Sequence, residues 1–226
     1  MLAAAAALSP ALGQSTSAAR GALWCPVPEG APKWARSLRM TVLVDSVLLS
    51  GKPAIRHAHR CYKIGWRGRP ALMIKQAAAE LSSARHVAPL VVIGIGYNSL
   101  FQRHRRRYDY WARRWDREAA WFLRVLRRKG AKQFVWVMLR EPTARTVPRY
   151  AVRELSYYSW YFPYVNERLR RLDHRRDDVV LADWSKVGDR PGITYDSIHL
   201  NSHGGVLMAK LIKRTINREA LRQARP

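Results

Sequence analysis

"RMTVLVDS" (39–46) is a run of mostly aliphatic and β-branched residues that ends abruptly in an aspartate and a serine. Three similar runs follow along the chain: "APLVVIGIG" (88–96), "KQFVWVML" (132–139) and "DDVVLADW" (177–184). Apolar residues are nearly continuous in these runs, which is typical of strands that are buried on both faces, as in a parallel sheet. We therefore expect these four segments to be buried, parallel strands.

Helical patterns lie between and after these runs. We predict helices within 69–84, 108–130, 164–174 and 202–221. Pro70 suits the first turn of one helix, and Gly130 is a natural end for the next. The segment 108–130 places a stripe of large apolar side chains on one face, formed by Tyr108, Trp111, Trp115, Phe122 and Leu126. Strands that alternate with helices predict an α/β protein with a parallel sheet.

Composition limits the possible partners. The chain has 226 residues, 48 % of them hydrophobic, and a formal net charge of +25, so a sizeable core and anionic partners are both expected.

We predict a tail over 1–37 and one domain over 38–220. The apolar segment 1–15 is either an export signal or a disordered tail, because it lacks the usual positive n-region. No later stretch approaches the ~20 apolar residues of a membrane span.

Cysteines and histidines give little sign of a metal. Cys25 and Cys61 do not form a CxxC pair; they allow one disulfide in an oxidising compartment, but their spacing does not show that it forms. His57 and His59 have the spacing of two ligands on a strand, yet no carboxylate or third histidine lies nearby in the sequence. We therefore expect neither a metal nor a cofactor.

Polar residues follow the predicted strands where an α/β sheet has its functional site, at the carboxyl ends of the strands. Ser46 ends the first run, and "DSIHL" (196–200) follows the last one. A serine becomes a nucleophile when a base accepts its proton, which makes His199 a candidate base and Asp196 its orienting partner. Candidate donors to an oxyanion are the backbone N–H groups of Ser46 and Gly68 and the side-chain amide of Asn98.

In their order, these motifs resemble the SGNH (GDSL-type) hydrolases, above all the extracytoplasmic SGNH domains of membrane acyltransferases. Those domains carry GDSV, GRQ, GTN, VN, DW and DGVHL, followed by a glycine and a terminal helix. The motifs of this chain are VDSV (44–47), GRP (68–70), GYN (96–98), VN (165–166), DW (183–184) and DSIHL (196–200). The resemblance covers about residues 38–218. The chain departs from the pattern at Val44, where a glycine is usual, and at Pro70, where a glutamine is usual.

The resemblance implies a three-layer α/β/α, flavodoxin-like fold and a metal-free triad. Ser46 would be the nucleophile, His199 the base and Asp196 its partner, with Gly68 and Asn98 completing the oxyanion hole. The reaction would be hydrolysis or transfer of an acyl group from an O-acyl ester, of a cell-envelope carbohydrate or another small ester. The expected location is extracytoplasmic, at or beyond a bacterial membrane, although a cytoplasmic location stays open.

Other interpretations remain. Taken singly, Ser46, Asn98 and the Asp196–His199 pair also fit helix caps and turns. Val44 favours an SGNH fold without turnover that binds a glycan or an anionic polymer. The basic run "RHRRR" (103–107) fits a solvated helix face, an anionic envelope polymer or a membrane surface. Nucleic acid is a less favoured partner for it.

Overall fold

The computed structural model describes residues 27–225 except 102, 104 and 159. Segment 1–15 and Cys25 lie outside these residues, so the two interpretations of the segment, export signal or tail, and the disulfide that Cys25 and Cys61 allow are not tested by the structure. Among the helices built from the described residues, none has the length and apolar character that crossing a bilayer requires.

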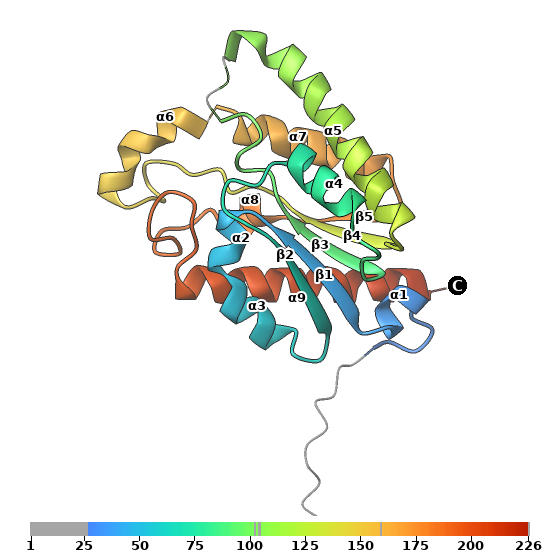
Figure 1. Cartoon of the computed structure of the whole chain (residues 1–226). Helices are drawn as coiled ribbons and strands as arrows, with labels where there is room; N and C mark the ends of the chain where they lie inside the picture. Colours follow the sequence, from blue (N-terminus) through green and yellow to red (C-terminus); the bar gives the residue numbers. More distant parts are fainter. Residues whose placement is uncertain (1–26, 102, 104, 159, 226) are drawn as a thin grey trace, which may run out of the picture.

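A parallel sheet forms the centre of the described structure (Figure 1). Its strand order is β2-β1-β3-β4-β5, the order of flavodoxin-like folds. The strands are β1 (Arg39–Val44), β2 (Lys63–Gly68), β3 (Leu90–Gly94), β4 (Gln133–Val137) and β5 (Val179–Ala182). The predicted parallel sheet is therefore confirmed, and each of the four apolar runs contains one of its strands.

The sequence pattern missed the remaining strand, β2. This strand lies at the edge of the sheet and pairs with β1 from Arg39↔Lys63 to Val44↔Gly68. Its residues, "KIGWRG", are exposed or only half-buried. Because an edge strand with little buried surface needs no continuous apolar run, the pattern that identified the other strands is absent here.

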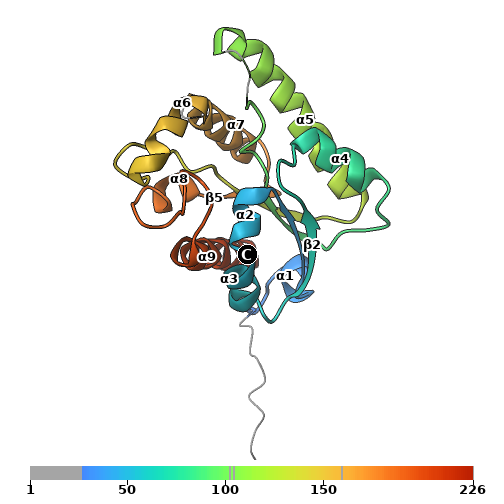
Figure 2. The same ribbon diagram turned by 60° about the vertical axis from the view of Figure 1, so that its left-hand side comes forward.

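Helices cover both faces of the sheet, which confirms the predicted α/β/α layering (Figures 1 and 2). The longer helices α4, α5 and α7 lie on one face, and α3 and α9 lie on the other. The α-helices are α1 (Lys33–Arg36), α2 (Ser46–Ser50), α3 (Lys52–Ala58), α4 (Ile74–Ser82), α5 (Tyr108–Arg128), α6 (Leu155–Tyr158), α7 (Phe162–His174), α8 (Trp184–Val187) and α9 (Ser202–Ala224). Short 3-10 helices cover Arg105–Arg107 and Arg149–Glu154.

The start of α4 differs from the sequence expectation. The helix begins at Ile74, and Pro70 lies in the preceding loop rather than in the first turn. Ala71 has a φ of 57°, in the left-handed region that a right-handed helix cannot include. The turn after β2 therefore delays the helix by several residues.

The core lies between the sheet and these helices. β1, β3 and β4 are buried along almost their whole length, and Trp115, Phe122 and Leu126 of α5 pack onto the same core, as their spacing predicted. Trp34 of α1 is also buried, and its indole N–H donates a hydrogen bond to the side chain of Gln223 in α9 at 2.9 Å. Packing thus includes residues before 38 and after 220; those domain boundaries stay predictions.

Candidate active site

The strand order places the candidate site. β1 and β3 are neighbours, but the chain leaves β1 toward β2 and leaves β3 toward β4, so the two connections diverge. Divergence of this kind opens a crevice at the carboxyl ends of the two strands. Ser46 follows β1 and Asn98 follows β3, so both lie at this end of the sheet.

Asp45 joins the turns that follow β1 and β3. It is the N-cap of α2, and its carboxylate accepts the backbone N–H of Val47 at 3.1 Å. The same fully buried carboxylate accepts the N–H groups of Gly96 at 3.2 Å and Tyr97 at 3.3 Å. Ser46 is therefore held as the first residue of α2, at a fixed position relative to the loop that carries Asn98.

Asp196 and His199 reach Ser46 from the loop before α9. His199 Nε2 lies 2.9 Å from Ser46 Oγ, and His199 Nδ1 lies 2.6 Å from Asp196 Oδ2. The other oxygen of Asp196 accepts the backbone N–H groups of Ile198 at 2.8 Å and His199 at 2.7 Å. The structure thus brings the three predicted triad side chains together in one chain of hydrogen bonds.

Electrostatics set the protonation of this chain. The hydrogen bond that His199 donates to Asp196 raises the pKa of His199, and partial burial opposes the rise. Burial alone would raise the pKa of Asp196, but hydrogen bonds from the side chain and backbone of His199 and from a neighbouring N–H lower it overall. An ionised carboxylate only accepts, so His199 Nδ1 carries the hydrogen and Nε2 presents its lone pair to Ser46. The side chain of His199 is 26 % exposed, so it is accessible from solvent.

The pKa of Asp45 is raised, whereas that of Asp196 is lowered. Desolvation raises the pKa of Asp45 to about 6, although three backbone N–H donors and the charge of His199 lower it. Asp45 makes no hydrogen bond to Ser46 or His199 among the described contacts. Its place in the network is structural, as a link between two turns.

The loop that carries the Asp–His pair is closed on itself and anchored to α2. An antiparallel bridge joins Thr194 to Leu200, and the N–H of Tyr195 donates to the carbonyl of His199 at 3.1 Å. The N–H of Leu200 donates to Ser50 Oγ at 2.9 Å. Asn201 then caps α9 by accepting the N–H of Gly204 at 3.0 Å. These contacts hold His199 against the helix that begins at Ser46.

Gly68 occupies a position that no other residue fits. Its φ is 138°, and a Cβ placed there would lie 2.0 Å from the carbonyl oxygen of Val44. The same Cβ would lie 2.9 Å from Val44 Cγ2. The bulk of Val44, which stands where the SGNH motif that the sequence resembles has glycine, is therefore accommodated by the missing side chain of its strand partner.

Asn98 carries a buried amide donor without a partner. Its Nδ2 makes no hydrogen bond to any described residue. The neighbouring Tyr97 fixes this loop, because its N–H donates to Asp45 and its hydroxyl accepts the N–H of Arg140 at 2.7 Å. A buried donor without an acceptor is costly, and an oxygen atom of a ligand would satisfy it.

Arg140 is a residue of this site that the sequence analysis did not single out. It follows β4, is fully buried, and donates hydrogen bonds through all three of its guanidinium nitrogens. The acceptors lie in the loops around the Asp–His pair: the carbonyls of Thr146, Gly188, Arg190 and Ser197 and the hydroxyl of Thr194. The available signal was an arginine directly after a buried strand, where only a fully hydrogen-bonded guanidinium is tolerated.

The remaining motifs fix loops. Asn166 of α7 is buried; its Oδ1 accepts the N–H of Leu139 at 2.8 Å, and its Nδ2 donates to the carbonyl of Leu139 at 2.9 Å and to Glu141 at 2.7 Å. Asp183 caps α8, its carboxylate accepting the hydroxyl of Ser185 at 2.5 Å. These side chains hold the ends of β4 and β5.

The spacing of His57 and His59 suits two ligands on a strand, but the structure does not place them on one. His57 lies in α3 and His59 is the C-cap of that helix. His59 is buried, and its Nδ1 donates to the carbonyl of Ile55 at 2.9 Å. Within the described ranges, no three His, Cys, Asp or Glu side chains are grouped as metal ligands would be.

Comparison with known proteins shows the fold. No family model matches the chain, and no curated protein matches it in sequence. The C-terminal catalytic domain of peptidoglycan O-acetyltransferase A from Streptococcus pneumoniae is 18 % identical, with a TM-score of 0.56, and the match covers 80 % of this chain and 93 % of that one. A GDSL-like lipase from Bacteroides thetaiotaomicron is 15 % identical (TM-score 0.60, covering 81 % and 89 %). An acetyl xylan esterase is 14 % identical (TM-score 0.59, covering 78 % and 98 %). The resemblance to SGNH hydrolases is confirmed at the level of the fold.

Proposed function

We propose that this protein is a serine-dependent ester hydrolase or acyl-transfer enzyme of the SGNH type. The observation that carries the proposal is the chain of hydrogen bonds from Ser46 Oγ through His199 to Asp196. The unpartnered amide of Asn98, on the adjacent strand end, supports it. A nucleophile, a base, an orienting carboxylate and a free donor are the groups that acyl transfer needs.

The reaction begins when His199 Nε2 accepts the proton of Ser46 Oγ, which attacks the carbonyl carbon of the ester. Asp196 stabilises the imidazolium that forms. The N–H groups of Ser46 and Gly68 and the amide of Asn98 hold the oxyanion of the tetrahedral intermediate. Its collapse breaks the ester C–O bond, and His199 gives its proton to the departing alcohol oxygen.

An acyl group is then bound to Ser46 Oγ. Water or a sugar hydroxyl attacks its carbonyl carbon while His199 accepts the attacking proton. Collapse of the second intermediate releases the acid or the new ester and returns the proton to Ser46 Oγ. Water gives hydrolysis and a sugar hydroxyl gives transfer, so one set of groups serves both reactions.

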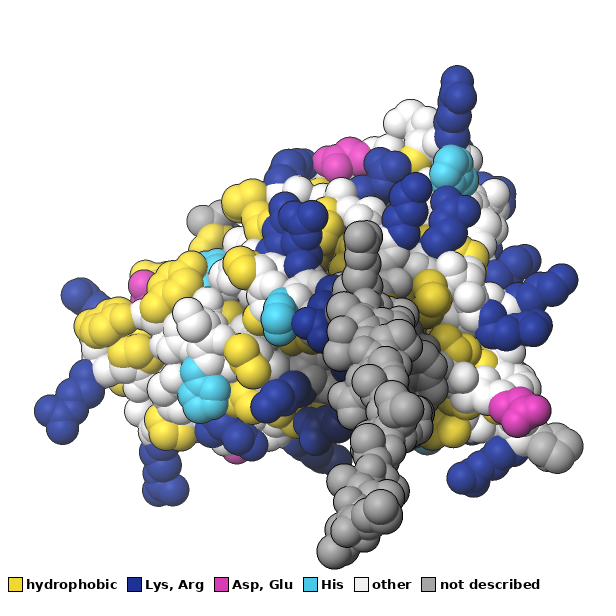
Figure 3. All heavy atoms as spheres, turned by 90° about the horizontal axis from the view of Figure 1, so that it is seen from below, with side chains coloured by type: hydrophobic (Ala, Val, Ile, Leu, Met, Phe, Trp, Pro, Cys, Tyr) yellow, Lys and Arg dark blue, Asp and Glu magenta, His cyan; other side chains and the backbone are white. Residues whose placement is uncertain are grey.

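The substrate class we propose is an O-acylated carbohydrate of the cell envelope, handled outside the cytoplasm. The names of two similar structures, a peptidoglycan O-acetyltransferase and an acetyl xylan esterase, support an acylated glycan. A net charge of +25 supports attraction to an anionic polymer or membrane surface. On the face seen in Figure 3, lysine and arginine side chains are spread widely and acidic ones are isolated.

A binding module without turnover is the second candidate function. Val44 favours it, because this buried valine stands where the resembling sequences have glycine. The binding module would retain the fold and the basic surface and would hold a glycan or anionic polymer. Nucleic acid stays a less favoured partner.

Labelling with a fluorophosphonate probe tests the proposal, because the probe reacts with an activated serine. We expect stoichiometric labelling at Ser46, its loss in Ser46→Ala and a rate at least a hundredfold lower in His199→Ala. Ser83→Ala, at an exposed serine after α4, is the matched control and should label like the wild type. A folded wild-type protein that takes no label would refute the hydrolase and make the binding module the better hypothesis.

A further inference from the structure

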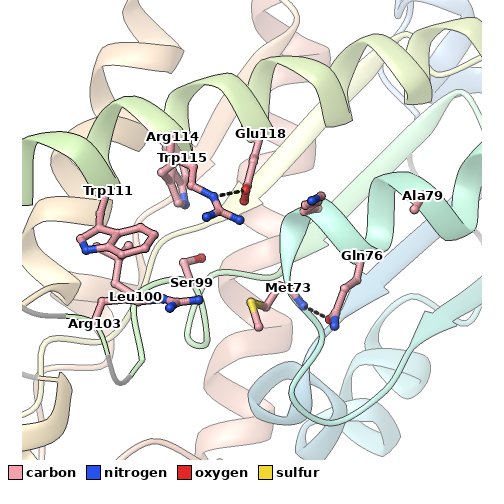
Figure 4. A pocket seen from close by; sticks show the side chains of 11 residues that line it. Met73, Gln76, Ala79, Ser99, Leu100, Arg103, Trp111, Arg114, Trp115 and Glu118 are labelled. Carbon is pink, nitrogen blue, oxygen red and sulfur yellow. Dashed lines mark hydrogen bonds and ion pairs between the residues drawn. The ribbon is translucent and has the colours of Figure 1, made fainter.

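A hollow lies between α4, α5 and the loop after β3 (Figure 4). Its volume is about 340 Å³, within the size of small-ligand sites. One wall is α5, which contributes Trp111, Arg114, Trp115 and Glu118. The opposite wall is α4 with its N-cap, which contributes Met73, Gln76 and Ala79. The loop after β3 contributes Ser99, Leu100 and Arg103. We call this hollow the α4–α5 pocket.

The pocket adjoins the oxyanion residues along the chain. Ser99, which lines it, directly follows Asn98. Met73, on the other wall, follows the turn that leaves Gly68. Both walls of the pocket are therefore continuations of the loops that carry the candidate oxyanion donors.

Three buried donors in the pocket walls have no hydrogen-bond partner among the described residues. They are the hydroxyl of Ser99 and the indole N–H groups of Trp111 and Trp115. Trp115 is only 4 % exposed. Buried donors are almost always paired, so three donors around one hollow without partners among the described residues favour a ligand that supplies oxygen acceptors.

The charge of the pocket is positive. Its lining contains Lys75, Arg103 and Arg114 and a single acid, Glu118. Glu118 accepts a hydrogen bond from Arg114 Nε at 2.8 Å, which leaves Lys75 and Arg103 uncompensated within the pocket. The guanidinium of Arg103 lies 4.5 Å from the ring centroid of Trp111, a cation–π contact that holds it over the pocket wall.

We propose that the α4–α5 pocket binds an acidic sugar unit of the acylated glycan and thereby selects anionic polymers as substrates. Neutral N–H and O–H donors suit the hydroxyl and ring oxygens of a sugar, and the two basic side chains suit its carboxylate. The role of the pocket in selecting a substrate rests on the proposed function. Binding of the acidic sugar by the pocket does not require turnover. It adds a recognition site to the reacting groups of Ser46, His199 and Asp196.

Calorimetric titration tests the pocket without relying on activity. Full-length Ser46→Ala protein is titrated with tetragalacturonic acid and with the same oligosaccharide fully methyl-esterified. We expect the acid to bind at least tenfold more tightly. Lys75→Gln and Trp111→Phe, each added to the same protein, should weaken binding of the acid by about tenfold, as expected for the loss of one hydrogen bond to a charged ligand or one well-placed donor. Lys33→Gln, at an exposed lysine on α1, removes the same charge elsewhere and should have no effect.

Ser99→Ala distinguishes a ligand site from a structural role. Because the hydroxyl has no partner within the described protein, its removal should leave the urea unfolding midpoint unchanged or raise it. The same change should weaken binding of the acid severalfold. A lower midpoint with unchanged binding would overturn the inference.

Three further results would also overturn it: equal affinity for the acid and its methyl ester, no binding of either, or displacement of the acid by single-stranded DNA that binds more tightly. Fluorophosphonate labelling of the wild type is scored separately. Labelling without binding refutes the pocket and retains the hydrolase, whereas binding without labelling retains the pocket and refutes the hydrolase.

Discussion

Replacement of Arg140 by methionine should release the loop that carries Asp196 and His199. Methionine is close to arginine in length, so the core is filled, but every donor is lost. The five hydrogen bonds of the buried guanidinium would be broken, and their acceptors lie in segments 146 and 188–197. The variant therefore tests whether this one side chain positions the Asp–His pair.

The magnitude follows from two opposing effects. Hydrogen bonds to a charged group contribute about 1.5 kcal/mol or more each, so five would contribute at least ~7.5 kcal/mol without relaxation. Removing the guanidinium also removes the cost of burying its charge. That cost is reflected in the pKa of Arg140, which burial lowers. Water can reach some of the freed carbonyls. We expect the free energy of unfolding to fall by about 3–5 kcal/mol.

The assays are urea unfolding followed by circular dichroism and the rate of fluorophosphonate labelling under native conditions. Labelling should slow at least tenfold, because small displacements of a catalytic base are costly. Arg140→Lys keeps the charge but has a single nitrogen, so it should recover less than half of the lost stability. Arg124→Met, at an exposed position on α5, is the matched control. An Arg140→Met protein with the unfolding midpoint of this control and a labelling rate within twofold of wild type would refute the reasoning.

Three other changes test the site. In the wild type, the labelling rate should fall as the pH is lowered through the pKa of His199, which lies above its usual 6.5 because Asp196 raises it; the base that we propose is neutral His199. In Asp196→Asn the fall should move to lower pH and the plateau rate should drop by about a hundredfold or more, and an unshifted pH profile would count against the pair. Gly68→Ala should lower the unfolding free energy by more than about 2 kcal/mol, because the φ of 138° and the 2.0 Å approach to Val44 exclude a Cβ; a soluble variant of wild-type stability in urea would contradict this. Val44→Gly should cost about 3 kcal/mol in the same assay, because it empties a buried site and frees the backbone. If it also labels tenfold faster than the wild type, the native chain is better described as a binding module.

Buried strands were predictable because burial leaves a local mark. β1, β3, β4 and β5 lie within continuous apolar runs, so the α/β class and the parallel sheet followed from the sequence. β2 was not predictable in this way, since its side chains are exposed or only half-buried and its place in the sheet depends on pairing with β1. The start of α4 was also missed, because it depends on the left-handed conformation of Ala71, which no residue type specifies.

The candidate site was likewise predictable only in part. The sequence by itself determined which groups were available: a serine after the first strand, an asparagine after another and an Asp–x–x–His near the end of the chain. Only the tertiary structure decided that His199 Nε2 lies 2.9 Å from Ser46 Oγ across 153 positions of the chain, and that Arg140 donates hydrogen bonds to the loop that carries Asp196 and His199. The unpaired donors of the α4–α5 pocket likewise emerge only when α5 packs against α4 and the loop after β3. Side-chain chemistry and periodicity are local properties that a sequence displays directly, whereas hydrogen bonds between distant segments depend on how the whole sheet and its helices pack.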